Sequence, residues 1–219
     1  MNLRTSILVF TFAIGAAACN KTTPFPPGLD PLDSENRASL PRAEGNDPYP
    51  EKLSITSGHE HGYDWVHARG YVHAAPAQTW EAIHTPQVSA DPKLDGPHFT
   101  LDVEKMYEYS YRIHYEPSPG IEFEVTWRHG LADGTDDAPV VTASRFQKTW
   151  GTTYINLLQG SVVTRDVLDS STMLPVQGVT EVEFIEHLDA TASGTDTLEE
   201  YFHNLFKNVL KHVGRPVPK

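Results

Sequence analysis

The last part of the chain carries the clearest periodic pattern of apolar and polar residues. Over residues 195–213 the apolar positions recur at i, i+3, i+4 and i+7, which predicts one amphipathic α-helix. Asp196 has the position of an N-cap with Glu199 three residues later, and Gly214 and Pro216 follow the last turn. A face this long must pack on another element, and it consists of Leu198, Tyr201, Phe202, Leu205, Phe206, Val209, Leu210 and Val213.

Alternation with a period of two precedes this helix and predicts β-strands. The longest alternating stretch, residues 99–115, is too long for one strand, so we expect a break near residues 104–106. Pro76 opens a short helix that ends before Pro86. The order predicts an α+β domain, in which a curved antiparallel sheet of about seven strands packs on the long C-terminal helix. The strands are expected at residues 64–74, 99–115, 121–131, 140–150, 154–168 and 179–188.

Charge and cysteine content narrow the possible partners. The 219 residues have a formal net charge of −12 at pH 7, whereas nucleic acids and anionic membrane surfaces attract clusters of Lys and Arg. Cys19 is the only cysteine, which excludes an intrachain disulfide and a Cys-based metal cluster. We therefore expect a monomer without a nucleic-acid partner, a cofactor or a metal site.

The N-terminus has the layout of an export signal. Arg4 precedes an apolar run at residues 7–14, which is too short to span a bilayer, and three alanines follow at residues 16–18. Because Cys19 comes directly after them, residues 1–18 resemble a bacterial lipoprotein signal peptide, and this resemblance implies acylation of Cys19. Ordinary signal cleavage after Ala18 is the alternative. Asn20 is not the Asp that retains such proteins at the inner membrane, which implies the outer membrane, on its periplasmic or surface side.

A proline-rich segment separates the predicted anchor from the domain. Residues 19–60 contain seven prolines and show neither the 3.6-residue period of a helix nor the two-residue period of a strand. We therefore interpret them as a lipid-anchored linker, part of which packs on the domain as a strap. Residues 61–219 then form the domain. His59 and His61 near the boundary have the spacing of metal ligands, but two histidines without a third ligand favour a polar loop.

The domain resembles the helix-grip fold of the START-like, Bet v 1-like (SRPBCC) superfamily. The matching segments are residues 71–83, where a strand runs into a helix opened by Pro76 and containing Trp80, together with residues 179–185 and the final helix. The resemblance covers about residues 60–215 and implies a hydrophobic ligand between the sheet and the last helix. Such domains include lipid carriers, binders of plant hormones and polyketides, and a minority of enzymes.

The expected partner is thus a hydrophobic small molecule or lipid, bound against an apolar lining with a few polar groups. The same aromatic residues would fill a solid core if no cavity exists, and the sequence leaves both arrangements open. The candidate ligand-binding residues on the strands and the final helix are Tyr109, Tyr111, Phe123, Val125, Trp127, Tyr201, Leu205, Phe206 and Val209.

Arg165 is a further candidate, because it shares the parity of mostly apolar positions in residues 155–167. Pointing inward, it would bind a ligand carboxylate or phosphate. A bulge near Gly160 would instead turn it into solvent.

Three functions remain open: an envelope lipoprotein that carries a hydrophobic molecule, a cyclase- or hydrolase-like enzyme, and an interaction module with a filled core. We expect the carrier. The sequence has no nucleophile elbow, phosphate-binding glycine loop or zinc-protease motif. A cavity above about 300 Å³ would favour the first two functions, and a His or Glu with a shifted pKa facing it would favour the enzyme. The scattered histidines are expected on the surface, namely His67, His73, His98, His114 and His129.

Overall fold

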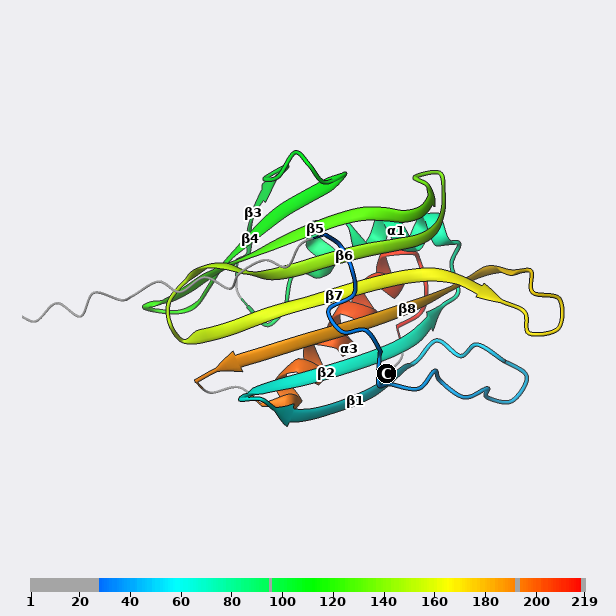
Figure 1. The fold of residues 1–219 in the computed structure, drawn as a ribbon, viewed down its shortest axis with the longest axis horizontal. Coiled ribbons are helices and arrows are strands. Elements are labelled where there is room, and N and C mark those ends of the chain that lie inside the picture. Colours follow the sequence, from blue (N-terminus) through cyan, green and yellow to red (C-terminus); the bar gives the residue numbers. More distant parts are fainter. Residues whose placement is uncertain (1–27, 95, 192–193, 218–219) are drawn as a thin grey trace, which may run out of the picture.

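The computed structural model describes residues 28–94, 96–191 and 194–217, so the predicted signal peptide, Cys19 and the start of the linker lie outside the described residues. Eight antiparallel strands form one sheet in the order β1-β2-β8-β7-β6-β5-β4-β3, and α3 lies along one face of it (Figure 1). The elements are β1 Leu53–Glu60, β2 Tyr63–Val72, α1 Pro76–Ile83, α2 Pro86–Ser89, β3 His98–Leu101, β4 Tyr109–Ser118, β5 Ile121–Thr135, β6 Ala138–Gly151, β7 Ile155–Leu168, β8 Pro175–Ala190 and α3 Thr195–His212.

The final helix forms as its periodicity predicts. Leu198, Phe202 and Leu205 are buried against the face of the sheet that we call the inner face. The predicted N-cap is wrong, because the cap is Gly194 and no side chain closes the first turn. Glu199 instead accepts a hydrogen bond from the hydroxyl of Ser57 on β1 at 2.5 Å, which fixes the helix to the edge of the sheet. No helix in the described part of the chain is both long and apolar enough to cross a membrane.

The sheet has eight strands rather than about seven, because residues 53–60 form β1 instead of the end of a linker. This segment lacks a strong apolar alternation, but it pairs along its whole length with β2, from Leu53 opposite Gly70 to Glu60 opposite Tyr63. The predicted break in the long alternating stretch is confirmed, since residues 102–108 separate β3 from β4.

We call residues 28–52 the strap: its first part crosses the outer face of the sheet, the face opposite α3, and its second part loops beyond the ends of the strands to reach β1 (Figure 1). Arg145 on β6 donates to the Asp30 carbonyl, and the backbone N–H of Leu32 donates to Ser161 Oγ on β7 at 2.9 Å. The Asn36 side chain then donates to the carbonyl of Ala68 on β2 at 3.1 Å. Polar contacts from successive strands therefore hold this first part of the strap roughly at right angles to the strands.

The strap explains why several strands are apolar on both faces. Ile185 on β8 points away from α3 but is only 2% exposed, and Tyr71, Val167 and Val179 form a second, smaller apolar cluster with strap residues. Burial by the strap supplies the hydrophobic stabilisation that an outer face in water would lack.

Candidate functional site

The interior between the sheet and the helices is filled at one end and hollow at the other. At the filled end, under α1, the Tyr111 hydroxyl donates to Ser89 Oγ at 2.7 Å. The rings of Trp127 and Phe146, which stack 4.3 Å apart, lie at the boundary and also line the hollow end. His129 is also buried at the filled end, and its Nδ1 lies 2.8 Å from Ser144 Oγ. Burial, with some repulsion from His84, lowers the pKa of His129 well below its ordinary value, so the imidazole packs as a neutral ring.

The hollow end is a cavity of about 330 Å³ beneath the N-terminal half of α3. Its wall is mostly aromatic and aliphatic, which suits an apolar ligand, and its volume lies at the small end of ligand pockets. The lining includes Pro117 and Ser118, two exposed residues of the β4–β5 hairpin. The lining is Asp91, Leu94, Tyr115, Pro117, Ser118, Ile121, Phe123, Val125, Trp127, Phe146, Tyr154, Ile155, Leu158, Glu186, Leu188, Ala190, Thr197, Leu198 and Tyr201.

Four of the ten candidate ligand-binding residues line this cavity: Phe123, Val125 and Trp127 on β5, and Tyr201 on α3. The other tyrosines, Tyr109 and Tyr111, lie nearer α1, where their hydroxyls bond to Asp136 and Ser89. On α3, the side chains of Leu205, Phe206 and Val209 are buried in the core beyond the cavity and do not line it.

Arg165 is not a ligand-binding residue of this cavity. The register of β7 against β8 shifts between Ile155 and Leu157, so the residues that share parity with Arg165 face outward. The Arg165 guanidinium lies 3.3 Å from Glu183 and its side chain is 41% exposed. Arg165 therefore points outward, as it would after the alternative of a bulge in this strand. The irregularity lies at the start of β7, however, and not near Gly160.

Glu186 is the functional candidate that the sequence reasoning missed. It is 3% exposed, it faces the cavity, and its Oε2 has no hydrogen-bond partner. Burial raises the pKa of Glu186 well above 4.5, and the nearby Asp91 carboxyl adds to the shift, so this site favours the neutral acid. Its signal in the sequence is parity, since Val182, Phe184 and Leu188 on the same strand also face inward.

Two tyrosines and an aspartate surround the same part of the cavity. Tyr201 donates its hydroxyl to the Ser89 carbonyl at 3.1 Å, while the Tyr115 hydroxyl oxygen accepts the backbone N–H of Asp91 at 3.3 Å. Burial raises the pKa of both tyrosines, and the charge of Glu186 would raise both further. Burial also raises the pKa of Asp91. The polar groups of the cavity are thus carboxyls and hydroxyls held close to one another.

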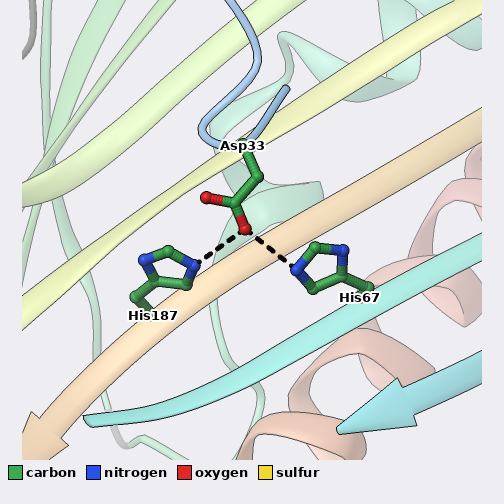
Figure 2. Close-up of side chains that lie close together, drawn as sticks. All are labelled: Asp33, His67 and His187. Atoms are coloured by element: carbon green, nitrogen blue, oxygen red, sulfur yellow. Dashed lines mark hydrogen bonds and ion pairs between the residues drawn. The ribbon is translucent and has the colours of Figure 1, made fainter. Parts of the chain in front are cut away.

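A second cluster of titratable groups lies on the outer face, where Asp33 of the strap meets His67 on β2 and His187 on β8 (Figure 2). One oxygen, Asp33 Oδ2, lies 3.0 Å from Nε2 of His67 and 3.1 Å from Nε2 of His187. Burial alone would raise the pKa of Asp33, but bonds from the two histidines hold it well below its ordinary value. The predicted surface position is wrong for His67, which is fully buried, as it is for His129.

These three side chains have the types and spacing of metal ligands, but the bonding of His67 favours a proton there. Its Nδ1 accepts the backbone N–H of Arg37 at 2.9 Å, so a neutral His67 carries its proton on Nε2. A metal at Nε2 would require that nitrogen to be bare. We therefore interpret the cluster as a clasp that fixes the strap. The other group with ligand spacing, His114, Glu116 and Glu122, lies at the partly exposed β4–β5 hairpin.

The order of elements identifies the fold. A strand pair leads into two short helices, six further antiparallel strands follow, and the long final helix lies along the inner face. The chain has a helix-grip arrangement, an antiparallel sheet packed on a long C-terminal helix. This confirms the helix-grip architecture that the resemblance in residues 71–83 and 179–185 predicts.

Similar solved structures are distant in sequence. The human StarD13 lipid transfer and protein localization domain aligns with a TM-score of 0.49 and 9% identity, over 75% of this chain and 84% of that one. An uncharacterized protein from Rhizobium leguminosarum aligns at 0.47 and 12%, over 75% and 99%. The Zhui aromatase/cyclase from a Streptomyces species aligns at 0.43 and 12%, over 76% and 97%. No family model and no curated protein match the sequence.

Proposed function

We propose that the protein binds a hydrophobic small molecule or lipid in the cavity beneath α3 and carries it in the cell envelope. The observation that carries this proposal is the cavity itself, which has a volume of about 330 Å³ and a mostly apolar lining. A concave, mostly apolar pocket with a few polar groups is the usual form of a small-molecule site. The cavity also counts against the interaction module with a filled core.

A cavity-filling variant tests the proposal. Leu158→Trp places a large ring in the wall of the cavity, whereas Val140→Trp adds the same ring at an exposed position on β6 and serves as the matched control. Native mass spectrometry and solvent extraction of protein purified without detergent should find a bound apolar molecule in the wild type and in Val140→Trp. Leu158→Trp should lose it. A wild-type protein that is always empty, and takes up no fluorescent lipid, would refute the carrier.

The proposed place of action is the membrane surface, through acylation of Cys19. The support is in the sequence, where the only cysteine follows the apolar run and the three alanines. Cys19→Ser should move the protein from the membrane fraction to the soluble fraction after export. Retention of Cys19→Ser in the membrane fraction would refute the anchor and would leave the ligand site untouched.

A second candidate function, conversion of the bound molecule by acid catalysis, is favoured by Glu186 alone. A buried carboxyl whose pKa is raised and that faces an apolar cavity can donate a proton to a bound substrate. If the protein is such an enzyme, the mass of the extracted molecule should change on incubation with the wild type and not with Glu186→Gln. An unchanged mass in both incubations would leave carriage as the function.

A further inference from the structure

The polar end of the cavity offers hydrogen atoms without acceptors. As a neutral acid, Glu186 carries an O–H, and no described residue bonds to its Oε2. The Tyr115 hydroxyl oxygen already accepts from Asp91, so its own hydrogen remains available, and no described residue accepts it. The hydrogen of Tyr201, in contrast, is used by the Ser89 carbonyl. A buried polar group without a partner is costly, so a ligand that supplies the missing acceptor would be stabilised here.

Charge limits what that acceptor can be. No Lys, Arg or His belongs to the lining. The cations near it are engaged: Lys93 pairs with Glu200 on the surface, and Lys148 donates to the carbonyls of Thr152 and Ile155 at 2.7 Å each. A ligand carboxylate or phosphate would therefore lie in an apolar site beside Asp91 and Glu186 without a counter-charge, and burying an unpaired charge is far more costly than burying a neutral oxygen.

We infer that the cavity selects uncharged hydrophobic molecules that carry a carbonyl or similar acceptor oxygen, held by hydrogen bonds from Glu186 and Tyr115, and that it rejects fatty acids and other anions. The inference rests on the proposed function, since it describes the ligand of the same cavity. It also replaces the expectation that an arginine binds a ligand carboxylate, because Arg165 lies on the outer face.

The test compares ligands that share a chain and differ in the head group. Full-length protein carrying Cys19→Ser, purified without detergent, is loaded with the neutral dye Nile red. The dye is then displaced by 2-decanone, decanoate or decylamine at pH 7. We expect 2-decanone to displace it at a concentration at least tenfold lower than either charged compound. Tighter binding of decanoate, or of decylamine, would overturn the inference.

Variants of Glu186 test whether this residue donates the hydrogen bond that gives the preference for 2-decanone. Glu186→Leu, which cannot donate, should reduce the affinity for 2-decanone severalfold, and Glu186→Gln, whose amide still donates, should reduce it less. Glu81→Leu on the exposed face of α1 is the matched control and should change nothing. Equal affinities for 2-decanone in Glu186→Leu and the control would overturn the inference while the carrier function stands. If neither Nile red nor any decyl compound binds, the proposed function fails, and the inference fails with it.

Discussion

Replacement of Glu186 by glutamine should stabilise the fold, and the gain should depend on pH. Glutamine keeps the shape and polarity of the neutral acid but has no proton to release. The folded-state pKa of Glu186 is raised above its unfolded value of 4.5. Between these two values the unfolded chain has released the proton while the folded chain still holds it. The free energy of unfolding therefore decreases as pH rises through this window, and the penalty is absent below pH 4.5.

The size of the effect follows from the same linkage. Each pH unit in the window lowers the free energy of unfolding of the wild type by about 1.4 kcal/mol. The loss accumulates from pH 4.5 up to the raised folded-state pKa, and Glu186→Gln removes it. Even the loss over one pH unit is a noticeable part of the roughly 5–15 kcal/mol by which domains are stable.

Urea unfolding followed by tryptophan fluorescence between pH 4.5 and pH 8 measures this difference directly. Wild type and Glu186→Gln should differ by only a few tenths of a kcal/mol at pH 4.5, and the gap should widen with pH. Glu81→Gln, at an exposed position on α1, is the control and should follow the wild type. A difference that is constant with pH, or a destabilised Glu186→Gln, would refute the assignment of Glu186 as a neutral buried acid.

Three further predictions concern the strap, the clasp and the sheet. Asp33→Ala should lower the free energy of unfolding by about 2 kcal/mol at pH 7, because two histidine contacts to a carboxylate are lost. It should also speed hydrogen exchange in residues 28–52, and Asp30→Ala is the control. The pKa of Asp33 is depressed below 3.8, so its contribution is present above pH 3.8 and should disappear as pH falls further; a loss that persists there would contradict this. Zn²⁺ should leave the melting temperature unchanged, and a rise that His67→Ala abolishes would show that the clasp binds metal. Gly160→Ala should lose about 2 kcal/mol in urea unfolding, because its Cβ would collide with the Phe146 ring and would lie 2.6 Å from the Ile185 carbonyl; an unchanged midpoint would show that Phe146 can move.

The elements with a clear period could be predicted from sequence alone. The apolar stripe of α3 predicts both its extent and its buried face, since Leu198, Phe202 and Leu205 lie where the period of 3.6 places them. Pro76 likewise marks the first residue of α1. These are local signals, and they depend on few distant contacts.

The parts that depend on distant contacts were harder to predict. Parity alone cannot place Arg165, because a register shift at the start of β7 reverses which face its strand presents. The residue pattern of β2 does not predict that His67 is buried, because the strap, which is distant in sequence, covers its side chain. The cavity could not be predicted from the apolar pattern, because the same residues of α3 and the sheet could also have filled the space between them. One residue of the cavity could nevertheless be identified from the sequence, because Glu186 shares the parity of the inward apolar residues of its strand.

The strap also determines how the protein would respond to tension on its N-terminus. Its contacts follow one another across the sheet, from Asp30 at Arg145 to Asp33 at His187 and Asn36 at Ala68, so a pull would break them one at a time rather than together. Residues 28–52, fully peeled, would span at most roughly 80–90 Å at about 3.3–3.6 Å per residue. If Cys19 is anchored as proposed, the strap is a reserve of length that lets the binding domain move away from the membrane before any strand of the sheet bears load.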